Sequence, residues 1–258
     1  MSEKVRYEKE GKVAYLTIDN PPANTLSRQT FAELDEYVDR VNADPDVVLA
    51  VVTGAGDRFF SAGSDIKEMP EYEEPIRVQF QRRAHGTQWK IERGPKLFLA
   101  AINGAAGGGG CELALTCDLV VAAERAVFTL PEPRIGIIPG FGGIQRLIRR
   151  VPLACAYDLL VSRDIISAQR ALSMGLVSRV FPNESFEEDV RQFAQRIAEG
   201  APISLRLIKR LVVEGLEMRI ADALSMELDA CPELWATADK EEGIRSFIEK
   251  RPPVFQNR

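Results

Sequence analysis

The stretch INGAAGGGGCELAL, residues 102–115, sets four consecutive glycines directly before an apolar run that contains Glu112. Glycine loses more conformational entropy on folding than other residues, and a carboxylate among apolar side chains needs a partner when buried. Bare backbone admits a close ligand, and a helix start offers unpaired N–H groups with a partial positive charge. These features suit a developing oxyanion, such as one on a thioester carbonyl, with Glu112 beside it. Tight packing of a helix against a strand, with Glu112 as an acid at the helix start, explains the stretch equally well.

Two phosphate-binding interpretations of the glycines fail on the residues that follow them. A Walker loop requires Gly-Lys and then Ser or Thr, whereas Cys111 and Glu112 follow here. A dinucleotide-binding turn requires a third glycine at the position of Leu113. A carboxylate at the mouth of the turn would also repel a pyrophosphate. We therefore set both interpretations aside.

A second stretch, FFSAGSDIKEM at residues 59–69, repeats the pattern of small residues between a buried strand and a helix start. Asp65 can cap that helix, and the main-chain N–H of Ser64 can supply a second donor to the same oxygen. Two converging donors make an oxyanion hole, whereas a single donor does not. The alternative is a simple capped turn.

A third stretch, LPEPRIGIIPGFGG at residues 130–143, places Glu132 between two prolines. Because the residue before a proline favours extended conformations, we expect the backbone of Glu132 to be extended and stiff. A carboxylate in a fixed position suits acid–base catalysis, which depends first on geometry. The alternative is a proline-stiffened turn that carries an exposed acid.

The rest of the chain divides into an α/β part and a helical part. Strands rich in apolar and β-branched residues are expected at residues 13–18, 47–53, 97–102 and 118–122. Helices are expected at residues 27–43, with Ser27 as the cap, and at about 66–93. Helical spacing dominates the later sequence, at 186–197, 203–218, 220–230 and 239–250. We expect an α/β core over residues 1–195 and a helical C-terminal region over residues 196–258.

Composition excludes several classes of function. The net charge of −5 argues against a nucleic-acid partner, which would favour a basic face. The charged N-terminus and the lack of a long apolar run predict neither a signal peptide nor a membrane span. One histidine, His85, and four cysteines without a Cys-x-x-Cys pair argue against a metal site and a Ser-His-Asp triad. We interpret His85 as a surface or packing residue and the cysteines as reduced thiols of a cytoplasmic protein.

Taken together, the three stretches resemble the crotonase family, the enoyl-CoA hydratase/isomerase superfamily. SAGSDIKEM (61–69), AAINGAAGGGGCELAL (100–115) and PEPRIGIIPGFGGIQRL (131–147) are similar to the three ordered motifs of that family. The flanking segments DNPPANTLS (19–27), SAQRALSMGLV (167–177) and FIEKRPPVF (247–255) also match. The resemblance covers nearly the whole chain.

The resemblance implies an α/β crotonase fold, in which a spiral of β-β-α turns precedes a helical C-terminal region that mediates trimer formation. Such homotrimers often pair into hexamers. Ser64 and Gly109 match the family's two oxyanion-hole donors, and Glu112 and Glu132 match its two catalytic acids. The implied contacts to coenzyme A and the acyl group are Ala62, Ser64, Asp65, Ile66, Lys67, Gly108, Gly109, Gly140 and Lys250. Ser64 stands where alanine is commoner, which a main-chain donor should tolerate.

The activity implied by both acids is enoyl-CoA hydration, the reversible syn addition of water across the 2,3 double bond of a 2-enoyl-CoA thioester. Glu112 would activate the water and Glu132 would protonate C2. No metal or separate cofactor is expected, because coenzyme A is part of the substrate. The alternatives are a double-bond isomerase, a hydratase of a cyclic or dienoyl thioester, and a non-catalytic binding protein of the same fold.

Overall fold

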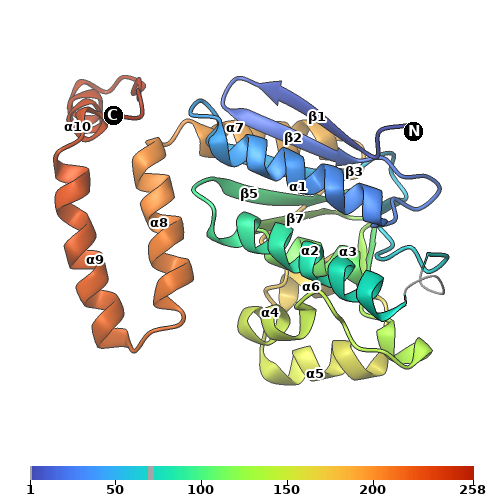
Figure 1. The fold of residues 1–258 in the computed structure, drawn as a ribbon. Coiled ribbons are helices and arrows are strands. Elements are labelled where there is room, and N and C mark those ends of the chain that lie inside the picture. Colours follow the sequence, from blue (N-terminus) through green and yellow to red (C-terminus); the bar gives the residue numbers. More distant parts are fainter. Residues whose placement is uncertain (1, 69–72) are drawn as a thin grey trace.

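The computed structural model describes residues 2–68 and 73–258 of the chain (Figure 1). An antiparallel hairpin opens the fold, and its second strand begins a run of parallel pairs. Within the described residues, the larger sheet runs in the order β1 (Val5–Glu10), β2 (Val13–Ile18), β3 (Leu49–Gly54), β5 (Leu97–Ile102), β7 (Leu119–Ala123) and β10 (Arg179–Phe181). The four strands expected from the sequence are confirmed, with ends that differ by no more than two residues.

Side chains of this sheet alternate between two apolar layers, as the two-residue period of a strand requires. Leu16, Val52 and Ala100 pack in the layer under helices α1 (Arg28–Ala43) and α2 (Glu74–Arg93). Their neighbours Tyr15, Val51 and Leu99 pack in the opposite layer, against α7 (Phe186–Ala198). Burial on both faces explains why the β3 and β5 sequences are almost continuously apolar.

A second, smaller sheet is formed by short strands, three of which directly follow strands of the larger sheet along the chain. In the described residues it runs in the order β4 (Phe59–Ser61), β6 (Ala105–Gly107), β8 (Val127–Thr129) and β9 (Ile166–Ser167). The chain passes from β3 to β4 and then α2, and from β5 to β6 and then α3 (Gly109–Thr116). It passes likewise from β7 to β8, the 3-10 turn η2 (Glu132–Ile135) and α4 (Gly143–Arg150). This repeated strand–strand–helix order confirms the expected α/β spiral of β-β-α turns.

Two helix starts show how local sequence sets the boundaries. Ser27 caps α1 as expected, because its hydroxyl oxygen accepts the N–H of Thr30 at 3.1 Å. The helix expected from about residue 66 begins only at Glu74, with Pro75 in its first turn. Proline favours the first turn of a helix and cannot continue one from the preceding turn, which accounts for the later start. Part of the expected segment, residues 69–72, lies outside the described residues.

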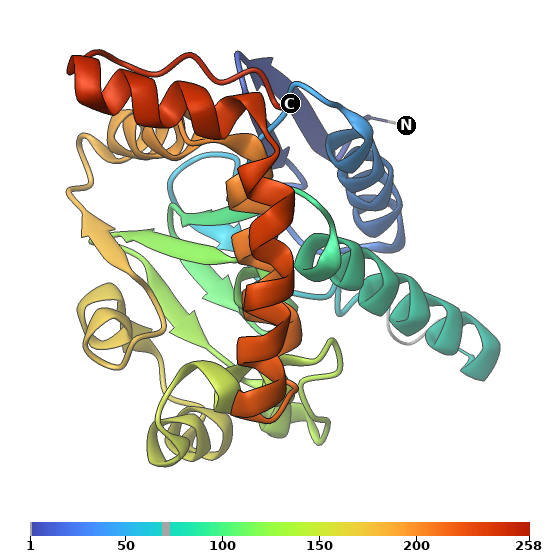
Figure 2. The ribbon, with the colours of Figure 1, turned by 90° about the vertical axis from the view of Figure 1, so that its left-hand side faces the viewer.

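The C-terminal region is helical, as expected, and extends away from the sheets (Figures 1 and 2). Its helices are α8 (Pro202–Gly215), α9 (Ile220–Trp235) and α10 (Ala238–Glu249), which follow α5 (Leu153–Ser162), α6 (Ala168–Ser173) and α7. Helix α7 spans the expected boundary at residue 195, so that boundary stays a prediction. Across the described part of the chain, no helix combines the length and apolar character needed to cross a membrane.

One buried lysine ties α8 to the sheet. Lys209 is 4% exposed, and its ammonium donates to the carbonyl oxygens of Ile91 at 2.6 Å and Lys96 at 2.7 Å. The ammonium also contacts Asp118 Oδ2 at 3.0 Å, and the same carboxylate oxygen accepts the N–H of Phe98. These three acceptors satisfy a charge that would be costly to bury alone.

The outer faces of α8–α10 carry many exposed apolar side chains. Those more than half exposed are Ile208, Val212, Leu216, Ile220, Leu224, Leu228, Trp235, Phe247 and Ile248. An excess of exposed apolar side chains on a few neighbouring helices is typical of a protein–protein interface.

Candidate active site

The glycine stretch forms the turn between β6 and α3. Gly108 has a φ of 50°, a left-handed conformation that favours glycine, and α3 begins at Gly109. A methyl group on Gly108 would lie 2.9 Å from Glu132 Oε1, so any side chain here would displace that carboxylate. The N–H groups at the start of α3 have no acceptor within the helix and are available to a ligand.

The loop after β4 runs beside this turn. Gly63 has a φ of 89°, and a methyl group on it would lie 2.7 Å from both the carbonyl oxygen of Gly107 and the nitrogen of Gly109. The nitrogen of Ser64 lies 3.5 Å from the position of a methyl group on Gly109. The structure therefore brings the main-chain nitrogens of Ser64 and Gly109 close together, from two different strand–helix connections.

Glu112 lies within α3 and is held by a loop that is distant in sequence. It is 1% exposed, and its Oε1 accepts the N–H of Phe141 at 2.8 Å and the N–H of Gly143 at 2.7 Å. A methyl group on Gly143 would lie 2.6 Å from Glu112 Cγ, so the close approach requires glycine. The two N–H groups supply the hydrogen-bond partners that a carboxylate buried in an apolar run needs.

Glu132 is the first residue of η2 and has a different setting. It is 9% exposed, and its Oε2 is buried without a hydrogen-bond partner among the described residues. The expected extended backbone is wrong, because Glu132 opens a 3-10 turn with Pro133 in it. Proline is tolerated there, since an N–H in the first turn of a helix has no intrahelical acceptor. The alternative of an exposed acid is also wrong.

Burial raises the pKa of both carboxyl groups. The pKa of Glu112 is raised to about 7, chiefly by burial and further by the charge of Glu132. The N–H bonds from Gly143 and Phe141 and the charge of Arg146 act in the opposite direction on that pKa. Burial also raises the pKa of Glu132. Two coupled carboxyls of this kind retain a proton at a pH where ordinary carboxyls have lost theirs.

The other predicted contact residues divide into those near this site and one that lies far away. Ala62, Asp65, Ile66 and Lys67 continue the loop that contains Ser64, and Ile66 is 64% exposed. The expectation that Asp65 caps a helix is wrong. It forms a turn instead, in which its Oδ1 accepts the N–H of Lys67 at 3.0 Å. Lys250 is the C-cap of α10, and α10 lies on the other side of the molecule from α2, the helix that follows this loop (Figure 1).

Sequence reasoning missed the residues that hold Glu112. Phe141 and Gly143 donate to it through the main chain, and Arg146 and His85 contact the same loop. The available signal was the run of glycines at 140, 142 and 143, since clustered glycine marks a close approach of backbone to another group.

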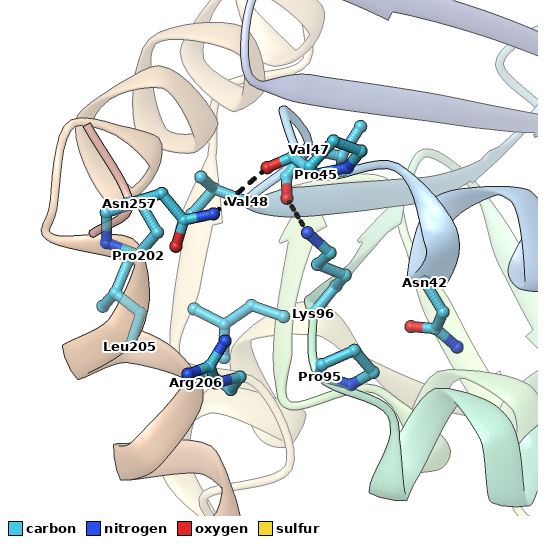
Figure 3. A pocket seen from close by; sticks show the side chains of 11 residues that line it. Asn42, Pro45, Val47, Val48, Pro95, Lys96, Pro202, Leu205, Arg206 and Asn257 are labelled. Carbon is cyan, nitrogen blue, oxygen red and sulfur yellow. Dashed lines mark hydrogen bonds between the residues drawn. The ribbon is translucent and has the colours of Figure 1, made fainter. Parts of the chain in front are cut away.

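A separate pocket lies at the amino ends of β3 and β5, against α8 (Figure 3). Lys96 reaches across it and donates to the carbonyl oxygen of Val47 at 2.6 Å. Asn257, near the chain's C-terminus, donates to the carbonyl oxygen of Pro45 at 3.4 Å. The two glutamates follow the carboxyl ends of strands, so this pocket is remote from them. Within the described residues, no group of three or more His, Cys, Asp or Glu side chains is placed to hold a metal ion.

Comparisons with known proteins match both the sequence and the fold of the chain. The sequence profile of the Enoyl-CoA hydratase/isomerase family matches residues 8–258. The chain is 41% identical over 254 residues to a crotonyl-CoA hydratase of Syntrophomonas wolfei, covering 98% of each chain. It is 38% identical over 253 residues to a short-chain-enoyl-CoA hydratase of Clostridium acetobutylicum, covering 97% of each. It superposes with a TM-score of 0.96 on a crystal structure of an enoyl-CoA hydratase from Bacillus anthracis, at 34% identity and 99% and 100% coverage.

Proposed function

The chain belongs to the enoyl-CoA hydratase/isomerase family, and we propose that it is an enoyl-CoA hydratase with Glu112 and Glu132 as its two catalytic acids. It adds water reversibly and syn across the 2,3 double bond of a 2-enoyl-CoA thioester. The observation that carries this assignment is the pair of buried carboxyl groups beside two adjacent main-chain nitrogens. One carboxyl group alone would not serve both proton transfers of hydration.

The N–H groups of Ser64 and Gly109 form the oxyanion hole in this proposal. They bind the thioester oxygen, which gains negative charge as water adds to C3 and an enolate develops. Each donor of this kind contributes about 10²–10³-fold to the rate. The support is that Ser64 N would lie 3.5 Å from a methyl group on Gly109, and that Gly109 begins α3.

Glu112 orients and deprotonates the water. Its Oε1 is occupied by the N–H groups of Phe141 and Gly143, which fixes the carboxylate and leaves Oε2 for the water. The water oxygen bonds to C3 while its proton passes to Glu112, and the electron pair of the double bond moves toward C2 and the thioester oxygen. A correctly placed base contributes about 10²–10⁴-fold.

Glu132 delivers the proton to C2. Its Oε2 lacks a partner, so nothing among the described residues stabilises the charged form by hydrogen bonding there. Burial raises its pKa, which favours the protonated form that an acid needs. In the reverse direction Glu132 removes the C2 proton and Glu112 returns a proton to the departing hydroxide.

Coenzyme A enters as part of the substrate, and the reaction needs no resident cofactor. In this proposal the loop that contains Ala62, Asp65, Ile66 and Lys67 contacts coenzyme A, while Gly108 and Gly140 border the acyl group. Lys250 contacts the coenzyme A phosphates from a neighbouring subunit in this proposal, because α10, which it caps, lies apart from α2 and the loop before it.

The proposed assembly is a homotrimer, or a hexamer made of two trimers, in the cytoplasm. The exposed apolar faces of α8–α10 support this assembly, because they extend from the core and need a partner to bury them.

The test is the loss of conjugated enoyl absorbance when the purified protein meets crotonyl-CoA. Wild-type protein should consume it, and Glu112→Ala and Glu132→Ala should be nearly silent while still binding a saturated acyl-CoA. Migration of the double bond without water uptake would instead indicate an isomerase. Tight acyl-CoA binding with no reaction on short, bulky or cyclic enoyl thioesters would contradict the proposed activity.

A further inference from the structure

The loop at residues 140–143 supplies both N–H donors to Glu112, and its carbonyl oxygens are held in turn. The N–H of Phe141 belongs to the same peptide unit as the carbonyl of Gly140. That carbonyl oxygen lies 2.9 Å from Nε2 of His85, on α2. Because a carbonyl oxygen only accepts, Nε2 donates in this contact. His85 therefore donates to the carbonyl oxygen of the peptide unit whose N–H donates to Glu112.

Arg146, on α4, holds the rest of the loop. Its main-chain N–H donates to the carbonyl of Gly142 at 3.1 Å, in the peptide unit that gives the N–H of Gly143 to Glu112. Its guanidinium Nη1 donates to the carbonyl of Phe141 at 3.0 Å. Three consecutive carbonyl oxygens, from Gly140 to Gly142, thus each accept a hydrogen bond from His85 or Arg146.

The guanidinium of Arg146 is itself fixed from α2. Its Nη2 lies 2.9 Å from Glu92 Oε2, and its Nε lies 3.3 Å from Glu92 Oε1, the two-point geometry that arginine makes with a carboxylate. Its Nη1 also lies 3.3 Å from Oε1 of the buried Gln88. The side chain of Arg146 is 13% exposed, so this network is largely shielded from water.

We propose that Arg146 and His85 are positioning residues for Glu112, which orient the 140–143 loop so that its N–H groups converge on Glu112 Oε1. The inference rests on the proposed role of Glu112 as the base. Neither residue touches the reacting atoms. The imidazole of His85 acts on the peptide unit that gives the N–H of Phe141, and the guanidinium of Arg146 acts on the next peptide unit, which lies between the two donors. A displacement of about 1 Å at a catalytic group costs about 10²-fold in rate.

Arg146 also acts on Glu112 through its charge. The charged groups that act on Glu112 are Glu132, which raises its pKa, and Arg146, which lowers it. Loss of the guanidinium removes a lowering influence and loosens two N–H bonds that also lower the pKa. Both changes act in the same direction, so the pKa of Glu112 should rise.

The first experiment compares Arg146→Met with Arg146→Lys and with Arg149→Met as the matched control. Arg149 lies on the same helix, and among the described residues its side chain bonds only to Gln145 of that helix. Arg146→Met should lower kcat about 10–100-fold, with KM changed by less than about threefold. The acid limb of its kcat/KM profile should move to higher pH by about half to one unit. Arg146→Lys should recover part of the lost kcat and reverse part of this shift. Unchanged kcat and an unmoved pH profile in folded Arg146→Met would overturn the proposal.

His85 gives a second test, because its side chain is exposed and its removal leaves no buried cavity. His85→Ala should lower kcat several-fold, and His85→Gln should recover it, since an amide N–H can reach the same carbonyl. This pair decides the question if Arg146→Met fails to fold. Equal rates for His85→Ala and wild type would remove His85 from the proposal.

A titration without substrate separates this proposal from the proposed activity. Infrared difference spectra between each protein and its Glu112→Gln counterpart report the Glu112 carboxyl directly. A higher Glu112 pKa in Arg146→Met than in wild type supports the positioning role even if no enoyl thioester is hydrated. An identical pKa would contradict that role whatever the activity assay shows.

Discussion

Glu112 and Glu132 border the same glycine turn but are treated oppositely by the structure. Glu112 Oε1 accepts two main-chain N–H groups from the 140–143 loop, whereas Glu132 Oε2 is buried without a partner among the described residues. Hydrogen bonds to a carboxylate favour the anion, and burial without such bonds favours the acid. The difference teaches that two identical side chains at one turn can have opposite hydrogen-bond surroundings, although burial raises the pKa of both.

Removing either carboxyl group should have the largest effect on activity. Glu112→Gln and Glu132→Gln should each lower kcat by about 10²–10⁴-fold, because each loses one proton transfer. The double variant should lose much less than the product of the single losses, since the two groups act as a unit. Steady-state hydration rates of the three variants test this. Near wild-type turnover in Glu132→Gln would leave Glu112 as the sole acid–base group.

Two glycine substitutions disturb one carboxyl group each while retaining both acids. Gly143→Ala places a methyl group 2.6 Å from Glu112 Cγ, and Gly108→Ala places one 2.9 Å from Glu132 Oε1. Each should lower kcat by about 10²-fold through displacement. Both should also lower the melting temperature, Gly143→Ala through the contact with the buried Glu112 and Gly108→Ala through backbone strain at its positive φ of 50°. Kinetics and thermal melts of both variants test this, with Gly86→Ala as the control, because a methyl group there meets nothing within 4 Å.

The stability of the fold should show what the buried charge of Glu112 costs. Its folded pKa is about 7 against an ordinary 4.5, so the folded state binds the extra proton between these values and loses stability as pH rises through them. Glu112→Gln should therefore be more stable than wild type at pH 8, by about 1–3 kcal/mol, with the difference vanishing below about pH 4.5. Urea unfolding across this range measures it. A constant difference at every pH would show that ionisation is not the cause.

The smallest effect concerns a side chain beside the proposed oxyanion hole. Ser64 contributes its main-chain N–H, so Ser64→Ala should change kcat/KM by less than about threefold. Steady-state kinetics on the same enoyl thioester test it, with Glu132→Gln as the reference for a large loss. A drop of more than about tenfold would mean that the hydroxyl takes part.

Some of this architecture could be predicted from sequence, and the physical reasons for the failures are specific. The strands of the larger sheet were predictable because runs such as residues 97–102 are long enough to show their apolar character. The short strands β4, β6, β8 and β9 span only two or three residues, too few for any periodicity. They form because neighbouring turns of the spiral stack, which is a non-local cause.

The site residues likewise divide into those that could be predicted from the sequence and those that could not. The glycine turn and both glutamates were identifiable from motifs, because each motif is local. The donors to Glu112 were not, since Gly143 lies 31 residues further along the chain and reaches it only when α4 packs on α3. The 3-10 turn at Glu132 also overrides the extended preference of a residue before proline, because tertiary burial of its carboxyl group decides the backbone there.

The buried ammonium of Lys209 also sets an order of events during synthesis. Its acceptors on Ile91, Lys96 and Asp118 are translated 118, 113 and 91 residues before it. A nascent chain that has completed β7 must therefore keep this edge of the sheet hydrated until α8 leaves the ribosome. This edge of the core can close only after residue 209 has been made, so a ribosome stalled before that residue would display an incompletely sealed domain to chaperones.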